Sequence, residues 1–325
     1  MKNILIISSI FFLNNNYAKE IQSELISKVF VNTVDDSSDY YQGKCFKKVK
    51  GSEVTSFEEK ISDGKCEKLP MGKIIYGTRE DWKYHTTGGF PVPRWGNKDL
   101  TRIIYKNYVV AYSNKYKLPL WVMSNQDKRS SKIEITGRGA DKFSCDPGLP
   151  SHLSTFQETF NNDSGSSFYH RGHLYPNGLG RTCKERVSTF LTTNIVPQVG
   201  SKFNAKVWKD LEECVRKRTE KENKLSIISG VIFPKKGKTC NFPDNPKYKN
   251  KLKSGLVVPC KFYKIIMDKE NKKYEAYLFD NIEYDKKSND VLKENSTTIT
   301  NISNITGLRF FPNIKNKYKS GLICE

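Results

Sequence analysis

Short runs of apolar residues, several of them alternating with polar ones, recur along the chain from about residue 96 onward. Runs of this kind that lie between Gly, Pro, Asn and Asp are typical of β-strands. The pattern predicts strands at Tyr108 to Tyr112, Leu120 to Met123, Arg186 to Ile195, Leu225 to Ile232, Cys260 to Met267 and Tyr274 to Phe279. One long helix is expected among them, because the chain lacks Gly and Pro from Phe203 to about Glu222. The mixture indicates an α+β fold.

The predicted helix carries Asn204, Trp208 and Glu212 at every fourth position. At roughly 3.6 residues per turn, this spacing puts the three side chains on one stripe. Mg²⁺ takes oxygen ligands and keeps most of its waters, so an amide oxygen near a carboxylate suits it. The stripe is therefore a candidate metal site formed by Asn204 and Glu212. The alternative is an ordinary amphipathic helix with Trp208 in the core.

A second candidate site lies upstream, where His170, Arg171, Gly172 and His173 follow one another. An imidazole accepts a proton near neutral pH, a guanidinium holds phosphate oxygens in a fork, and a glycine lets backbone and substrate approach closely. This combination suits a base that activates water beside a phosphate clamp. The alternative is a buried structural histidine in a turn.

Three segments, in this order, carry a resemblance to a known family. They are His170 to Leu174 (HRGHL), Asn194 to Gln198 (NIVPQ) and the helix with Asn204, Trp208 and Glu212. Together they resemble the DNA/RNA non-specific endonuclease family. Further similar blocks make the resemblance cover most of the chain after about Trp95; they lie at Tyr108 to Val122, Ile227 to Phe233, Val258 to Asp268 and Thr306 to Pro312.

The resemblance implies a ββα-metal (His-Me finger) nuclease fold, with a central, largely antiparallel sheet flanked by helices. His173 would lie near the end of one strand, Arg186 to Ile195 would form the next strand, and the metal helix would follow.

The resemblance also implies a role for each matching residue. His173 is expected to be the general base that deprotonates the attacking water, and Arg171 to contact the phosphate. Asn204 is expected to bind Mg²⁺ directly, with Glu212 holding the waters of the metal and Asn194 supporting the site through hydrogen bonds. Mn²⁺ is expected to substitute for Mg²⁺. The residue types suit these roles by themselves, because phosphodiester hydrolysis adds negative charge that cations stabilise, and a general base contributes a factor of about 10²–10⁴.

One position departs from the family pattern, which usually has Asp where this chain has His170. We expect the change to alter the orientation of Arg171 or to couple a second titrating group to His173. The base, the clamp and the metal ligand are all retained, so the chain is expected to be active.

The start of the chain predicts export. A lysine precedes the apolar run Ile4 to Leu13, and Ala18 offers a small residue for cleavage, so residues 1–18 are expected to be a signal peptide. The run is about half as long as a bilayer span requires, and no membrane anchor is expected. Residues 19–95 lack the family blocks and are expected to form an appended N-terminal subdomain. Residues 96–325 are then the endonuclease domain.

All eight cysteines follow this leader, and an even number in an exported chain favours disulfide bonds, with too many pairings open for the connectivity to be deduced. The sequence contains no CxxC motif, so a zinc site is not expected. Possible glycosylation sites lie at Asn162, Asn295, Asn301 and Asn304. The cysteines, and a leader without the Arg-rich pattern of a transit peptide, favour a secreted, extracellular protein over a mitochondrial one.

The formal net charge of +20 favours a polyanionic partner, although a Lys- and Asn-rich compositional bias would also raise it. The sequence thus predicts a secreted, Mg²⁺-dependent endonuclease with little sequence preference, acting on DNA and, as an additional candidate substrate, RNA. The alternative is a secreted protein that binds nucleic acid or other polyanions with weak or no catalysis. Plasmid cleavage with Mg²⁺ and then with EDTA separates the two.

Overall fold

The computed structural model describes residues 61–62, 65–66, 76–94, 100–127, 143, 145–146, 149, 168–221, 224–314 and 318–321. The predicted signal peptide, most of the predicted N-terminal subdomain and the sequon at Asn162 lie outside these residues. They remain predictions.

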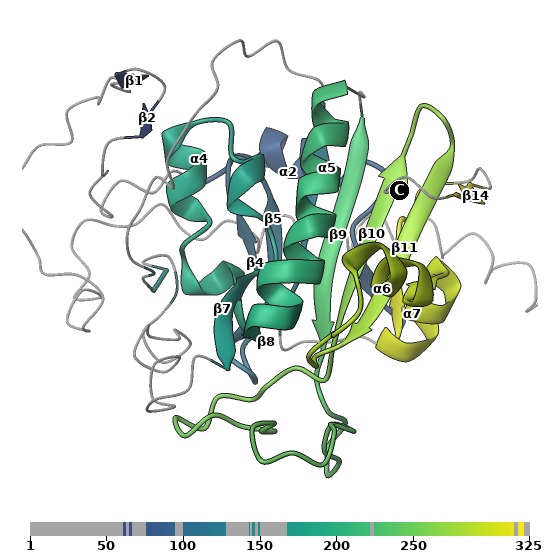
Figure 1. Ribbon diagram of the computed structural model, residues 1–325. Helices are drawn as coiled ribbons and strands as arrows, with labels where there is room; N and C mark the ends of the chain where they lie inside the picture. The colour runs from purple at the N-terminus through teal and green to yellow at the C-terminus, as the bar shows by residue number, and fades with distance from the viewer. Residues whose placement is uncertain are drawn as a thin grey trace, which may run out of the picture. The chain divides into compact units, whose positions relative to one another are not determined.

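A central, largely antiparallel sheet organises the described part of the chain (Figure 1). Its strands run in the order β12, β11, β10, β9, β6, β5 and β4, and β14 pairs with β11 in parallel. Their bounds are β4 (Leu100–Ile104), β5 (Val109–Ser113), β6 (Leu118–Gln126), β9 (Leu225–Ile232), β10 (Lys261–Asp268), β11 (Lys273–Asp280), β12 (Ser296–Thr297) and β14 (Lys319–Ser320). The strands predicted near Tyr108, Leu120, Leu225, Cys260 and Tyr274 are confirmed.

The predicted strand from Arg186 to Ile195 is wrong. This segment forms the helix α4 (Cys183–Ser188) and the 3-10 turn η3 (Thr192–Asn194), and the strand β8 (Ile195–Val199) only begins where the prediction ends. The cause is local, because the Thr182 hydroxyl accepts a hydrogen bond from the backbone N–H of Glu185 and caps the helix. A Thr followed three residues later by Glu is a helix-start signal that outweighs the apolar pattern here.

One face of the sheet is covered by a continuous helical segment, η4 (Gly200–Trp208) followed by α5 (Lys209–Lys221). Figure 1 shows α5 running alongside β9. The aromatic rings of Phe203 and Trp208 pack edge-on against Phe262 of β10, with centroid separations of 5.5 Å in both cases. These side chains are almost completely buried, so apolar burial fixes the helix on the sheet.

Smaller elements complete the described fold. They are β1 (Ile61–Ser62), β2 (Lys65–Cys66), α2 (Arg79–His85), β3 (Val92–Pro93), β7 (Tyr169–His173), η2 (Asn177–Leu179), α6 (Ser288–Glu294), α7 (Ile299–Thr306) and β13 (Leu308–Arg309). Residues 76–94 of the predicted 19–95 subdomain are described, and they are paired with the rest of the fold. Tyr76 forms a bridge with Tyr105, and β3 pairs with β13. Residues 76–93 therefore pack with the nuclease fold, while the domain boundary itself stays a prediction.

A disulfide between Cys240 and Cys260 closes the long connection from β9 to β10. Cys145 and Cys214 are also disulfide-bonded, and the described residues include no free cysteine. The expectation of a disulfide-stapled α+β fold is thus confirmed.

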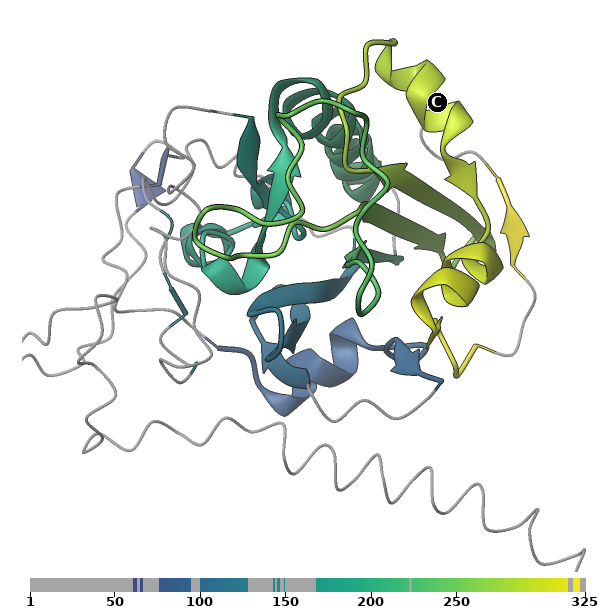
Figure 2. The same cartoon turned by 90° about the horizontal axis from the view of Figure 1, so that it is seen from below.

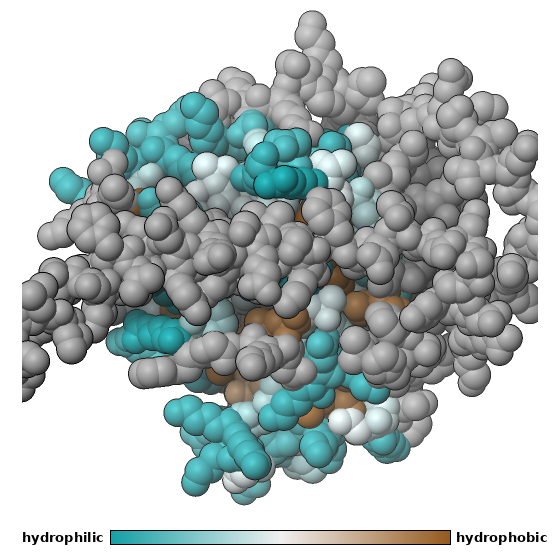
Figure 3. Space-filling view, turned by 180° about the vertical axis from the view of Figure 1, so that it is seen from behind, coloured by the Kyte–Doolittle hydropathy of each residue, from teal (hydrophilic) through white to brown (hydrophobic). Residues whose placement is uncertain are grey.

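The surface of the described residues is mostly polar. Seen from behind, the described residues form hydrophilic margins around a few apolar areas (Figure 3). Ile305 is the exposed large hydrophobic side chain among the described residues. In the same part of the chain, no helix has the length and apolar character needed to span a membrane.

Candidate active site

Strands β7 and β8 form a separate two-stranded antiparallel ribbon. Its register pairs His170 with Gln198 and His173 with Ile195. η2, α4 and η3 lie between the two strands in sequence, and η4 begins directly after β8, so the ribbon leads into the helix (Figure 1). This is the predicted ββα arrangement, with β8 in place of the segment that was expected to be its second strand.

The side chains of Arg171 and His173 share one face of β7, because alternate residues of a strand point the same way. Both contact Phe143. The Cζ atom of Arg171 lies 4.4 Å from the ring centroid of Phe143, and the His173 imidazole lies 5.5 Å from it, centroid to centroid. Phe190 packs edge-on to the same imidazole at 5.3 Å. These rings restrict the rotation of the predicted base and the predicted phosphate clamp, which keeps both groups oriented before substrate arrives.

The predicted metal helix begins with a π-helical segment, not with a regular α-helix. The backbone N–H of Lys209 donates to the carbonyl of Asn204, five residues earlier. This wider turn moves Asn204 off the stripe predicted from 3.6 residues per turn. Asn204 Nδ2 then lies 3.2 Å from His170 Nδ1, and Trp208 Nε1 donates to the carbonyl of His173 at 3.2 Å. The two helix residues thus hold β7 at two points.

His170 acts as a hydrogen-bond acceptor in this contact. An amide NH₂ can only donate, so His170 Nδ1 accepts and the imidazole is neutral, with its proton on Nε2. Burial lowers the pKa of His170, which favours the same uncharged state. Strand alternation directs His170 to the face opposite Arg171 and His173. A neutral acceptor therefore stands where the family usually has an Asp, which is also an acceptor.

Glu212 lies one turn after Trp208, above a buried cation. Lys264 is only 1% exposed, donates to Ser229 Oγ at 3.0 Å and places its ammonium 4.2 Å from the ring centroid of Trp208. Burial raises the pKa of Glu212 to about 7, and the charge of Lys264 opposes this shift. Burial lowers the pKa of Lys264 to about 8, and the charge of Glu212 opposes that shift. Lys264 therefore supplies positive charge that favours the carboxylate form of Glu212.

Asn194 is completely buried and its amide is used within the fold. Its Oδ1 accepts from the backbone N–H of Tyr175 at 2.8 Å, and its Nδ2 donates to the carbonyls of Tyr175 and Thr189 at 2.9 and 3.0 Å. These bonds fix the turn that follows His173. The predicted supporting role of Asn194 is compatible with this position and stays a prediction.

Gly172 is required by a neighbouring side chain. A Cβ atom built on Gly172 would lie 2.2 Å from Oε1 of Gln198, which is fully buried. The group that approaches the Gly172 backbone closely is therefore the side chain of Gln198 of β8.

The oxygens predicted to hold a metal are available for one. Within the described residues, Oδ1 of Asn204 accepts no hydrogen bond, and Oε1 of Glu212 is buried without a hydrogen-bond partner. A hydrated divalent cation could take the amide oxygen directly, and its waters could donate to the carboxylate. No cluster of three or more His, Cys, Asp or Glu that could hold a metal occurs in this part of the chain. Asn204 and Glu212 thus fit a mostly hydrated ion.

Comparison with known proteins decides the family. Residues 89–317 match the family described as DNA/RNA non-specific endonuclease. The chain belongs to this family. As a DNA/RNA non-specific endonuclease it is a phosphodiester hydrolase, as the sequence predicted, and members of the family with the ββα-metal fold use a divalent cation.

Individual relatives agree with this assignment. Nuclease C1 of Cunninghamella echinulata var. echinulata is 32% identical over 218 residues, which are 63% of this chain and 81% of that protein. The mitochondrial nuclease EXOG of Homo sapiens is 26% identical over 234 residues, 68% of this chain and 60% of that protein. A chain in the crystal structure of the EndoG/EndoGI complex superposes with a TM-score of 0.59 at 25% identity, covering 74% of this chain and 94% of that one.

Sequence reasoning missed two residues of this endonuclease site. Lys264 has a visible signal, since it is a lone charge within the otherwise apolar stretch of β10. Phe143 has none, because it lies far from β7 in the sequence and reaches the site only through the fold.

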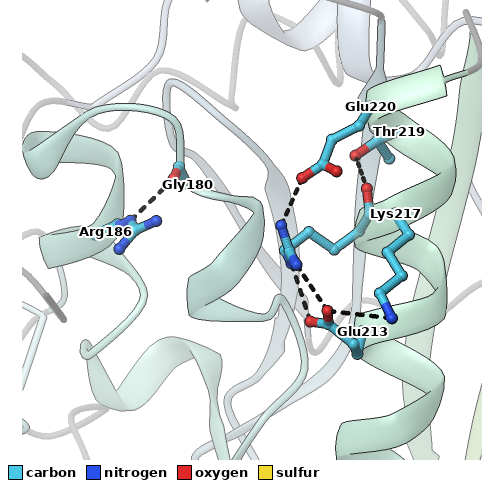
Figure 4. A network of polar contacts seen from close by, with 7 residues as sticks. Gly180, Arg186, Glu213, Lys217, Thr219 and Glu220 are labelled. Atoms are coloured by element: carbon cyan, nitrogen blue, oxygen red, sulfur yellow. Dashed lines mark hydrogen bonds and ion pairs between the residues drawn. The ribbon is translucent and has the colours of Figure 1, made fainter. Parts of the chain in front are cut away.

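One side of α5 carries ion pairs within the helix (Figure 4). Arg216 donates to Glu213 Oε1 at 2.7 Å and to Glu220 Oε1 at 2.5 Å, while Lys217 lies 3.8 Å from Glu213. The ion pairs stabilise the helix that carries Glu212. In the neighbouring segment, Arg186 Nε of α4 donates to the carbonyl of Gly180 at 3.1 Å.

Proposed function

We propose that this protein is a secreted, Mg²⁺-dependent endonuclease that hydrolyses phosphodiester bonds of DNA, and also of RNA, with little sequence preference. Mn²⁺ is the expected substitute for Mg²⁺. The observation that carries the proposal is the joining of the two predicted motifs: Asn204 contacts His170, and Trp208 holds the backbone of His173. The predicted base and the predicted metal ligand therefore come from elements that are locked together.

The residues divide the work of hydrolysis. His173 takes the proton from the attacking water, and its two aromatic neighbours keep the imidazole from turning away. Arg171, on the same face of the strand, contacts the phosphate that is cleaved. A bound divalent cation would supply positive charge to the phosphate oxygens as negative charge develops there. Asn204 would hold this ion directly, and Glu212 would hold its waters.

A lack of sequence preference follows from the type of contact. Cations and hydrogen-bond donors that bind phosphate carry no base information, whereas base edges specify sequence. The site residues described above are assigned to the attacking water, the phosphate and the metal. None of them is assigned a contact with a base edge. Secretion is supported by the predicted leader at 1–18 and by the disulfide between Cys240 and Cys260.

A nicking assay tests the catalytic proposal. Purified protein is incubated with supercoiled plasmid, with single-stranded DNA and with RNA, each in Mg²⁺, in Mn²⁺ and in Mg²⁺ with excess EDTA. We expect relaxed and then linear plasmid, cleaved RNA, and no cleavage with EDTA. A mobility shift without cleavage in either metal would instead identify a nucleic-acid-binding protein.

Secretion has its own test. The full chain, expressed in cells that export signal-bearing proteins, should appear in the medium with a new N-terminus at Lys19. Retention of the intact leader inside the cell would contradict this part of the proposal.

A further inference from the structure

The connection between β9 and β10 is the most strongly basic described segment near the site. Residues 234–260, here called the β9–β10 loop, contain seven Lys and one Asp, a net charge of +6. All seven lysines are exposed; they are Lys235, Lys236, Lys238, Lys247, Lys249, Lys251 and Lys253. Such a concentration of exposed ammonium groups attracts a polyanion.

Several lysines elsewhere on the described surface have acidic partners. Examples are the ion pairs Lys106 with Asp81, Lys202 with Asp285 and Lys286 with Glu294, with N···O distances of 2.8, 2.5 and 2.5 Å. No carboxylate of the described residues lies within ion-pair distance of Lys247, Lys249 or Lys251 of the loop. These three charges are therefore not neutralised by that part of the protein.

The loop has a fixed backbone. The disulfide from Cys240 to Cys260 closes it, and Cys240 N–H donates to Oδ1 of Asn250 at 2.7 Å. A short internal bridge pairs Lys251 with Val257. The side chain of Leu252 is only 4% exposed and packs in the main hydrophobic core, which anchors the loop to the rest of the fold. The lysines are thus presented on an ordered scaffold, which lowers the entropic cost of binding.

The loop is hydrogen-bonded to β7, the strand that carries Arg171 and His173. The Tyr169 hydroxyl of β7 accepts from the backbone N–H of Lys249 at 2.9 Å and donates to the carbonyl of Lys249 at 3.3 Å. The rings of Phe168 and Tyr248 meet edge-on at 5.0 Å. Figures 1 and 2 both show the loop beside β7 and β8. The basic surface is therefore continuous with the strand of Arg171 and His173.

We propose that the β9–β10 loop is a second contact site for the nucleic-acid substrate, which binds the sugar–phosphate backbone next to the cleaved bond. Tyr169 precedes His173 by four residues, or about 13 Å at about 3.3 Å per residue of strand. One strand of a duplex carries a phosphate about every 3.4 Å along its axis, so the loop reaches phosphates about four steps away. The proposal rests on the proposed nuclease function only for the identity of the polyanion.

Two matched triple variants test it. The loop variant is Lys247→Gln, Lys249→Gln and Lys251→Gln, which leaves the backbone bonds to Tyr169 in place. The control variant is Lys272→Gln, Lys273→Gln and Lys319→Gln. These lysines are also exposed, but they lie at the β10–β11 turn, at the other end of β10. Both variants lose the same net charge.

Binding is measured by fluorescence anisotropy on a labelled duplex longer than the site, without divalent metal and at several salt concentrations. Because each lysine–phosphate contact contributes about 0.9 to the slope of log K against log salt, we expect the slope of the loop variant to be shallower by about two to three. Its dissociation constant should rise at least tenfold at low salt, while the control should change by less than threefold. Equal weakening of both variants, or of neither, would overturn the proposal.

A second measurement separates this proposal from the nuclease activity. Turnover of a small chromogenic nucleoside phosphodiester, which lacks distant phosphates, should be the same for the loop variant and the wild type. Loss of that turnover in the loop variant alone would overturn the proposal, because it would mean that the substitutions disturb the site itself. A wild type that cleaves nothing but shows the predicted binding pattern would refute the nuclease function and leave the loop assignment standing.

Discussion

At the scale of single residues, the site combines groups that do chemistry with groups that hold them. His173 lies between Phe143 and Phe190, and its backbone carbonyl accepts from Trp208. His170 and Lys264 have no predicted contact with substrate, yet the first contacts Asn204 and the second lies beneath Trp208 near Glu212. Substitutions of the two classes should therefore have different signatures.

His173→Ala should lower the rate of cleavage by about 10²–10⁴ and leave DNA binding unchanged, because a general base contributes to the chemical step and the cationic surface supplies the affinity. The measurements are the turnover number on plasmid in Mg²⁺ and the dissociation constant from anisotropy. A variant that keeps the wild-type turnover would remove His173 from the mechanism.

His170→Ala should weaken the binding of a divalent cation, because Asn204 then loses the acceptor that orients its amide. Partners of metal ligands typically contribute about 10–100-fold to metal affinity. His170→Asp restores an acceptor and should stay within a few-fold of the wild type. Electron paramagnetic resonance of bound Mn²⁺, without substrate, measures both. Equal Mn²⁺ affinity in the wild type and His170→Ala would show that the contact with Asn204 does not position the ligand.

At the scale of elements, the π-helical start of the helix is what connects it to β7. A regular α-helix has i to i+4 bonds, whereas here Lys209 bonds back to Asn204, and Asn204 and Trp208 reach two different positions of the strand. π-helical turns are rare, and they occur frequently at functional sites. The junction between η4 and α5 therefore couples the strand of the base to the helix of the metal ligand.

Trp208→Phe tests this coupling. The change keeps an aromatic ring but removes the donor to the His173 carbonyl, which should lower the free energy of unfolding by about 1–3 kcal/mol and lower the turnover number with little change in KM. Trp121→Phe is the matched control, since Trp121 is equally buried and its indole N–H has no hydrogen-bond partner among the described residues. Urea unfolding and steady-state kinetics of both variants are compared. An equal loss of turnover in the two would mean that general core packing, not the bond to His173, is responsible.

For the molecule as a whole, the sheet contributes a buried charge, that of Lys264, which lies next to the site. β10 is an interior strand of the sheet, and its Lys264 side chain is directed toward Trp208 of η4. A buried lysine with a carboxylate nearby, both desolvated, links the stability of the fold to pH.

The sign of this dependence follows from the two pKa values. The pKa of Glu212 is raised to about 7, so folding binds a proton between the ordinary Glu pKa and pH 7, and stability falls as pH rises through that window. The pKa of Lys264 is lowered to about 8, so the unfolded chain binds more protons between pH 8 and the ordinary Lys pKa, and stability rises with pH there.

Lys264→Met should remove the second effect. Between pH 8 and pH 10, we expect the wild type to gain stability relative to Lys264→Met. In the variant, the loss of stability caused by Glu212 should continue above pH 7, because the nearby cation is missing. Urea unfolding of metal-free protein at pH 5, 7.5 and 10 measures the difference between the two curves. Parallel curves at all three values would show that Lys264 does not titrate in the folded state.

How far each feature could be predicted depended on whether its cause is local in sequence. The strand Leu225–Ile232 has the predicted bounds because its pattern is nearly continuous and apolar. The segment after Arg186 was mispredicted because a single cap at Thr182 overrides an apolar pattern. The need for glycine at position 172 follows from the side chain of Gln198, which pairs with His170 in the register but reaches the Gly172 backbone, and no spacing rule predicts this contact.

The sequence by itself determined the residue types of the site, the order of the two motifs, the main strands and the family, because periodicity, motif spacing and charge are properties of neighbouring positions. The tertiary structure decided the rest. It turned Asn204 toward His170 through a π-helical turn, placed Phe143 against His173 and Arg171, put Lys264 beneath Trp208, and joined the basic β9–β10 loop to Tyr169. Each of these contacts joins residues far apart in the chain, and each depends on how the elements and loops pack against one another, which the order of residues along the chain does not specify.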